Sequence, residues 1–561
     1  MVADAAEPGG PQPKGWSWRD RARGSVIHAT VLDPGSEPLD GIEAFQTAYV
    51  PDRLLVSEAP EGADLPGVLE RVREAAAAFG WGVVRERLDG TELGDGELPE
   101  RRLAGGPLSM RVRLTTPEEQ GGVSPALPDA WRVLQRVRRD ALDAWDARGA
   151  RSSRAARDPL RKRTSAEVAA ALREFRVDRV GLDHILTVDP IGLNPYTRTN
   201  PYTRTNPYTR TNPYTRTNPV GEYGESGSGG RQPVAWIGPG PDDIEVMRGC
   251  RRPVVAVLDT GIGAHGWLPD ALVDRDVRLD GIPIGFSDEA NPEVYPDLYG
   301  PLDGEIDPVA GHGTFIAGIV RQVAPSAELL AIRVADALGM VEESNLLYVL
   351  EDLGVLVQRF RDGDTRRGRP IDILNMSLGY YHETPEDGLY SRDLYDLLTT
   401  LRELGTTVIV SAGNDATDRP TFPAALWSWP GADNGIAPDG GAELVSVGAL
   451  NPDCRSTALF SNVGPWVRTF AVGAAVLSTV PDFVGGLQAT ARDDGYGRRR
   501  LTIAPEDFRG GFAIWSGTSF AAPLVSGLVA AALGQPSRKE GRGKAVAAAR
   551  AAVKKVLGDL G

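Results

Sequence analysis

The chain has 561 residues, of which 41% are hydrophobic, and a net charge of −15. This length predicts two or three domains, and the negative charge argues against nucleic acid or an anionic membrane as a partner. Two cysteines, Cys250 and Cys454, exclude a disulfide framework. The first twenty residues lack an apolar signal segment, and no stretch reaches the roughly 18 apolar residues of a membrane span. A cytoplasmic location is therefore expected, with unconventional export left open.

The N-terminal third predicts a small domain of mixed α and β structure. Residues 1–40 are rich in Gly, Pro and charge and are expected to be disordered. Within residues 41–190, strand patterns alternate with helical ones in the order β-α-β-β-α-β, which is the ferredoxin-like plan. The strands are expected at 48–56, with a bulge or edge at Pro51, and at 81–88, 110–114 and 182–188. An extra helix is expected at 165–175, and His184 is expected on the surface.

A repeat follows this domain. Four copies of Asn-Pro-Tyr-Thr-Arg-Thr fill residues 194–217, within a segment that runs from 191 to 232. A proline every six residues opposes both helix and regular sheet, so the tract is expected to be an extended tether. One interpretation is a plain linker. The other is that the arginine-bearing tract contacts a site in the following domain, where tethering gives it a high effective concentration.

Four polar residues stand at the ends of predicted strands or the starts of predicted helices. Asp259 ends the apolar run 254–258, and Asn414 follows the run 407–410. His312 lies between two glycines before an apolar helix, and Ser519 precedes the apolar run 520–533. Unpaired N–H groups and the positive end of the dipole gather at a helix N-terminus, where a hydroxyl can attack a carbonyl. The alternative for Ser519 is an ordinary helix cap.

The segments Asp259-Thr-Gly, Gly311-His-Gly-Thr and Gly517-Thr-Ser519 resemble the three motifs of subtilisin-like serine proteases, the subtilases. Their order is Asp, His, Ser, for which subtilisin is itself the reference case. Ser377-Leu-Gly379 and Ser411-Ala-Gly-Asn414 resemble two further segments of that family. The resemblance implies an α/β fold, a subtilisin-like parallel sheet flanked by helices, over 233–536, followed by a C-terminal helix over 537–561. The strands and helices that alternate in this region predict the same sheet.

The resemblance also implies a serine endopeptidase. Ser519 would be the nucleophile, His312 the base, Asp259 its orienting acid and Asn414 the oxyanion donor. The implied substrate-binding residues are Ser377, Leu378, Gly379, Ala412 and Gly413. No cofactor is required; calcium is possible, but no metal site is identified. The expected partners are protein or peptide substrates, the chain's own N-terminal domain and the repeat tract, with no nucleic acid and no membrane.

By the same analogy, residues 41–190 would be a propeptide-type domain of an autoinhibited zymogen, with cleavage between Val188 and Arg231. The alternatives are a non-catalytic peptide-binding module and a regulated effector protease with a sensor arm. His265 is expected to be structural. Two interpretations apply to the acidic residues before His312: they lie in a solvated loop, or they favour basic side chains in substrates. These residues are Asp297, Asp303, Glu305 and Asp307. Residues 481–510 are expected to form a hairpin over the cleft.

Overall fold

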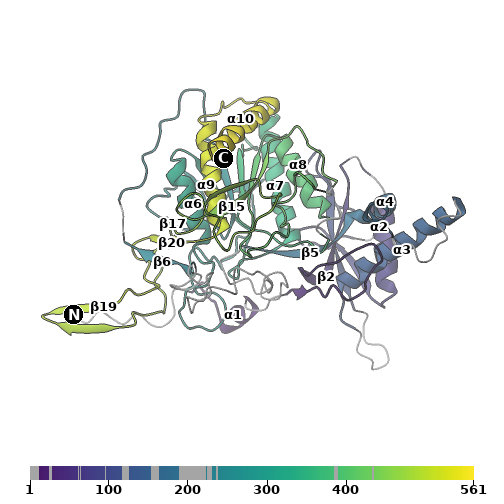
Figure 1. Ribbon diagram of the computed structural model, residues 1–561, viewed down its shortest axis with the longest axis horizontal. Coiled ribbons are helices and arrows are strands. Elements are labelled where there is room, and N and C mark those ends of the chain that lie inside the picture. The colour runs from purple at the N-terminus through teal and green to yellow at the C-terminus, as the bar shows by residue number, and fades with distance from the viewer. Residues whose placement is uncertain are drawn as a thin grey trace.

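The computed structural model describes residues 12–24, 28–60, 62, 65–94, 96–116, 126–152, 163–188, 223, 230–235, 238–384, 390–432 and 435–560. The repeat tract lies outside these residues. A larger α/β domain holds the middle of the molecule, and a smaller domain from residues before 189 lies beside it (Figure 1).

A seven-stranded parallel sheet forms the centre of the larger domain, as the alternating pattern predicts. Its strand order is β16-β15-β14-β13-β7-β11-β8. The strands are β7 (Val254–Asp259), β8 (Val273–Asp274), β11 (Glu328–Arg333), β13 (Ile373–Met376), β14 (Thr407–Ser411), β15 (Leu444–Leu450) and β16 (Thr469–Val472). Successive residues of a strand face opposite sides of a sheet, so β7 contributes to two cores. Val254, Ala256 and Leu258 join one, and Val255 and Val257 join the other.

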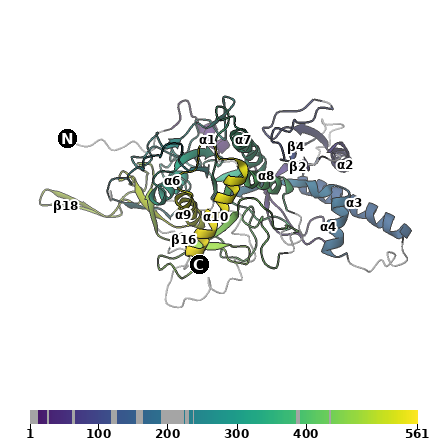
Figure 2. The ribbon, with the colours of Figure 1, turned by 90° about the horizontal axis from the view of Figure 1, so that it is seen from above.

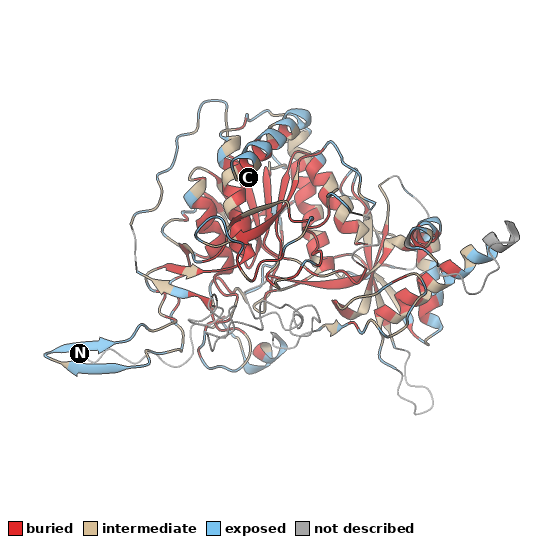
Figure 3. Cartoon of the chain, in the orientation of Figure 1, coloured by how far each residue is buried: buried red, intermediate tan, exposed pale blue. Residues whose placement is uncertain are grey.

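Helices cover both faces of this sheet (Figure 2). The face of Val254 packs against α7 (Glu343–Arg361) and α8 (Arg392–Glu403). The opposite face packs against α6 (His312–Val323), α9 (Thr518–Leu533) and the C-terminal α10 (Arg542–Leu560). The buried sheet and the exposed outer side of α10 are visible in Figure 3. His312, the first residue of α6, contacts Asp259 at the end of β7, and Ser519, in the first turn of α9, contacts Ser377 just after β13. Both helices therefore begin at the same end of the sheet.

The smaller domain is a sheet with helices on one face and the larger domain on the other. Its strands are β2 (Ala48–Glu58), β3 (Gly82–Glu86), β4 (Leu108–Thr115) and β5 (Val180–Thr187), in the antiparallel order β5-β2-β4-β3. Leu54 and Val56 pack with α2 (Leu65–Ala77), α3 (Ala130–Ser152) and α4 (Ser165–Glu174). Leu55 instead joins the core of α7 and α8. The register of β2 shifts between Tyr49 and Leu54, which is the bulge expected at Pro51.

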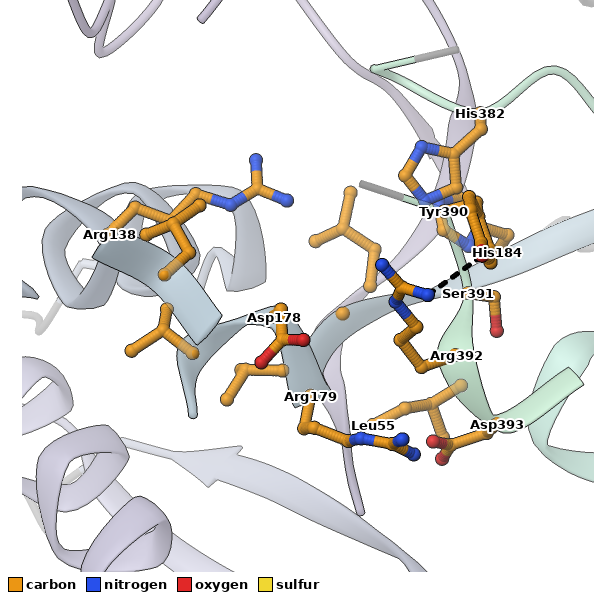
Figure 4. A pocket seen from close by; sticks show the side chains of 15 residues that line it. Leu55, Arg138, Asp178, Arg179, His184, His382, Tyr390, Ser391, Arg392 and Asp393 are labelled. Carbon is orange, nitrogen blue, oxygen red and sulfur yellow. Dashed lines mark hydrogen bonds between the residues drawn. The ribbon is translucent and has the colours of Figure 1, made fainter. Parts of the chain in front are cut away.

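A buried charged cluster lies where the two domains meet. His184, on β5, places Nδ1 2.6 Å from Glu343 Oε2 and Nε2 2.8 Å from Glu383 Oε2. Arg138 of α3 donates to the other oxygen of Glu383 at 3.2 Å. The expectation that His184 lies on the surface is therefore wrong, because the second face of the small sheet is covered by the larger domain. A cavity of about 30 Å³, room for one or two waters, adjoins this cluster (Figure 4).

The N-terminal segment is not wholly disordered as predicted. Residues 18–24 form α1 (Trp18–Gly24), and Arg21 reaches into the loop before α6. Its guanidinium donates to Asp297 Oδ1 and to the carbonyl of Asp297, both at 2.6 Å. Asp297 and Asp307 are buried, whereas Asp303 and Glu305 are exposed, so only part of this acidic loop is solvated.

Shorter pieces complete the fold. A three-stranded sheet contains β17 (Val476–Thr479), β20 (Phe512–Trp515) and β6 (Gln232–Val234), and β1 (Thr30–Val31) pairs with β2. The strands β9 (Arg278–Leu279) and β10 (Ile282–Pro283) pair with each other. The hairpin of β18 (Arg492–Gly495) and β19 (Arg498–Leu501) exists as expected, but it projects away from the body (Figure 1).

Cys250 and Cys454 are free thiols. Among the helices of the described residues, none has the length and apolar character needed to span a bilayer.

Candidate active site

Asp259 and His312 meet at the end of the central strand. Asp259 is the last residue of β7, and His312 is the first residue of α6, after Gly311 in the left-handed conformation (φ 82°). Asp259 Oδ1 lies 2.8 Å from His312 Nδ1 and accepts the N–H of Thr260, also at 2.8 Å. Both side chains are 0% exposed. A carboxylate at Nδ1 fixes the imidazole so that Nε2 carries the lone pair.

The ring of His312 lies near the residues that flank the start of α9. Its ring lies 5.4 Å from the ring of Trp515 and 5.2 Å from that of Phe520, the residue after Ser519. Within the described residues, His312 Nε2 is buried and makes no hydrogen bond. An unbonded, buried ring nitrogen of this kind is available to take a proton from a nearby hydroxyl.

Ser519 lies in the first turn of α9 and is 1% exposed. Asn414, after β14, is bonded to Thr518, the residue before Ser519. Asn414 Oδ1 accepts the backbone N–H of Thr518 at 2.8 Å and the hydroxyl of Thr518 at 2.9 Å. With Oδ1 fixed in this way, Nδ2 is held on the opposite side of the amide, toward Gly517. The structure thus brings Asn414 together with the serine motif.

The remaining predicted residues hold the site in different ways. Ser377 donates its hydroxyl to the carbonyl of Ser519 at 2.9 Å. Gly413, at φ 100°, donates its N–H to Thr518 Oγ1 at 3.1 Å. Leu378 and Ala412 are buried in the core, so their side chains contribute packing. Gly379 presents both backbone groups outward, and these pair with Thr187 of the small domain.

His265 is half-buried against Phe512, in keeping with a structural residue, and burial lowers its pKa. One nearby residue was missed by the sequence analysis. Glu293 is buried beside Asp259 and bonds to Thr260, Gly313 and Thr314. It lies in an irregular loop, where no local pattern marks it. Its position among three residues that neighbour Asp259 and His312 is visible only in three dimensions.

A sequence profile described as "Subtilase family" matches residues 251–555. The chain belongs to the subtilase family. The matched part of this subtilase covers every predicted site residue, from Asp259 to Ser519.

Similar proteins are serine proteases by name. An intracellular serine protease of Paenibacillus polymyxa is 29% identical over 287 residues, which are 49% of this subtilase and 65% of that protein. The serine protease AprX of Bacillus subtilis (strain 168) is 29% identical over 301 residues, 50% of this chain and 57% of that one. The chain thus spans about half to two thirds of the length of these relatives. A cold-adapted subtilisin-like serine proteinase of known structure, 19% identical, aligns over 55% of this subtilase and 86% of its own chain with a TM-score of 0.33.

Proposed function

We propose that this subtilase is a serine endopeptidase that hydrolyses peptide bonds through Asp259, His312 and Ser519. The observation that carries the proposal is the 2.8 Å contact of Asp259 with His312 Nδ1. It leaves Nε2 without a hydrogen bond to the described residues, and the His312 ring lies 5.2 Å from that of Phe520, the residue after Ser519. An ordinary helix cap at Ser519 would not need a buried carboxylate–imidazole pair beside it.

The proposed reaction follows from these positions. His312 Nε2 takes the proton of Ser519 Oγ as the oxygen attacks the substrate carbonyl, and Asp259 stabilises the resulting imidazolium. Asn414 Nδ2 and the N–H of Ser519 donate to the oxyanion of the tetrahedral intermediate. The imidazolium then gives its proton to the leaving amine, and water repeats the sequence on the acyl-enzyme. Each of these groups comes from the chain itself.

The test is covalent labelling with a fluorophosphonate, which reacts with an activated serine. The chain without its N-terminal domain, residues 232–561, is expected to label and to cleave casein, and Ser519→Ala is expected to do neither. Ser526→Ala serves as the control, since Ser526 lies on the same helix and donates to Asn375. Peptide binding without labelling would instead support the non-catalytic module.

We further propose that the full chain is autoinhibited by its N-terminal domain. Thr187, at the end of β5, donates its N–H to Gly379 O at 3.0 Å and accepts from Gly379 N at 3.1 Å. On the other side of β5 lies β12 (Met340–Glu342), and Val188 donates to Gly339 O at 2.9 Å. An extended segment bonded on both sides, to β12 and to Gly379, resembles an extended peptide substrate in a cleft, and this supports the proposal.

Thr187→Pro tests the inhibition because proline has no N–H to donate to Gly379. The full chain with this substitution is expected to hydrolyse a peptide substrate faster than the parent. Thr187→Val keeps the N–H and is expected to stay latent. Equal rates in all three chains would contradict inhibition through this contact. Cleavage between Val188 and Arg231, read by N-terminal sequencing of the active protein, remains part of the proposal.

A further inference from the structure

Glu293 forms a buried bridge behind Asp259 and His312. Its Oε1 lies 2.5 Å from Thr260 Oγ1 and accepts the N–H of Gly313 at 3.0 Å. Its Oε2 lies 2.5 Å from Thr314 Oγ1. Thr260 directly follows Asp259, and Gly313 and Thr314 directly follow His312. One carboxyl therefore contacts both segments that carry the proposed acid and base.

The hydroxyl of Thr260 stands between two carboxyl groups and has a single proton. It lies 3.0 Å from Asp259 Oδ1 and 2.5 Å from Glu293 Oε1, and it already accepts the N–H of Gly313 at 2.9 Å. If Glu293 is neutral, it is a weaker acceptor than the carboxylate of Asp259, so Thr260 donates to Asp259. If Glu293 is ionised, both carboxylates require the same proton. The protonation of Glu293 thus decides whether Asp259 receives this donor.

Burial favours the neutral form of Glu293 below about pH 7. Burial, followed by the charge of Asp259 on β7, raises the pKa of Glu293 to about 7, while its bonds to Thr260 and Thr314 act in the opposite direction. Arg231, before β6, is the nearby cation, and His312 of α6 is the other titratable group on this side. Two carboxylates so close together in a buried site do not both ionise easily.

We propose that Glu293 is a positioning residue: through Thr260 it sets how many donors Asp259 receives, and thereby the proton affinity of His312. Loss of a donor makes Asp259 more basic, and a second negative charge stabilises the imidazolium. Ionised Glu293 therefore raises the pKa of His312, and neutral Glu293 lowers it. Only the catalytic consequence rests on the proposed function; the effect on the imidazole does not.

The test follows the His312 ring by NMR in the full chain with labelled histidine, in a Ser519→Ala background that prevents self-cleavage. The signal is assigned by its loss in His312→Gln. Glu293→Gln cannot ionise, and its amide oxygen can still accept the N–H of Gly313. As a neutral acceptor it competes less for the Thr260 proton than a carboxylate does, and the substitution is expected to lower the His312 titration midpoint by about one pH unit. Glu289→Gln, the same change at an exposed position of this loop, is expected to leave the midpoint unchanged.

A second variant gives the opposite sign. Thr260→Val is made in the Glu293→Gln chain, where residue 293 cannot ionise. It removes the donor to Asp259, and the midpoint is expected to rise relative to Glu293→Gln. Unchanged midpoints in both comparisons, or shifts in the same direction, would overturn the proposal, and Glu293→Ala takes the place of Glu293→Gln in both if the latter fails to fold.

In the full chain carrying Thr187→Pro, which keeps Arg231, and with Ser519 intact, the acid limb of kcat/KM is expected to move with the midpoint in Glu293→Gln, with less than about tenfold loss at the optimum. An inactive parent would refute the proposed function alone, because the NMR titration still decides the role of Glu293.

Discussion

Replacing His184 is expected to loosen the N-terminal domain from the larger one and to abolish a pH dependence of their contact. Burial alone lowers the pKa of this imidazole, but the carboxylates of Glu343 and Glu383 outweigh it and raise the pKa to about 10. The ordinary value is 6.5, so the shift of about 3.5 units corresponds to about 5 kcal/mol. Because the folded pKa is the higher one, this stabilisation is complete below pH 6.5. It falls by about 1.4 kcal/mol per pH unit above that and is lost above about pH 10.

Hydrogen exchange measures this contact in the Ser519→Ala chain. The amides of Val341 and Gly379 are protected by β5 only while the domain is docked. After correction for the intrinsic rate, their protection is expected to fall about a hundredfold between pH 6.5 and 8.5. His184→Gln leaves two buried carboxylates with Arg138, so its protection is expected to be low already at pH 6.5 and nearly flat with pH. His382 does not add to the slope, because burial lowers its pKa to about 3.

The control is His28→Gln, the same change at an exposed histidine, which is expected to follow the parent. If His184→Gln kept the parent's slope, the imidazole would not be the group that titrates, and the argument from the two carboxylates would be refuted.

Three further outcomes are expected. In residues 232–561, Asn414→Ala should lower kcat with little change in KM; the loss for subtilisin's own oxyanion amide is roughly 10²–10³. Arg21→Met leaves Asp297 buried without its cation and should reduce the free energy of unfolding in urea by about 3 kcal/mol, whereas Arg19→Met, exposed on the same helix, should have little effect. Gly413→Ala places a Cβ 2.5 Å from Asn462 Nδ2 at φ 100°. It should reduce the free energy of unfolding more than Gly363→Ala, which has a similar φ (95°) but open space around it. Equal reductions would mean that backbone strain alone causes the loss.

The larger domain was predictable because its information is local. Apolar runs of strand length ending in Asp259 and Asn414 place those residues at one edge of a parallel sheet. The apolar run 254–258 lies within β7 (Val254–Asp259), and the apolar run 520–533 lies within α9 (Thr518–Leu533). His312 and Ser519 could be located because each follows glycine or small residues before an apolar helix. Such signals do not depend on the rest of the chain.

The features that the sequence did not predict depend on contacts between distant segments. His184 lies on a strand of mixed polar and apolar residues, and only the docking of a second domain buries it. Arg21 belongs to a polar segment that predicts disorder, yet its partner Asp297 lies 276 residues away in sequence. The role of Glu293 could not be predicted for the same reason. No pattern of hydrophobicity marks a loop carboxyl whose partners, Thr260 and Thr314, come from two other elements.

The pairing of β5 with β12 and Gly379 has a consequence for handling the protein. Departure of β5 would leave a row of N–H and C=O groups on Met340–Glu342 and Gly379 without bonding partners. Such an open edge accepts any extended chain, including a loop or tail of a neighbouring copy. The separated larger domain is therefore expected to aggregate or to undergo autoproteolysis as its concentration rises. A short peptide added in excess would be the simplest protectant.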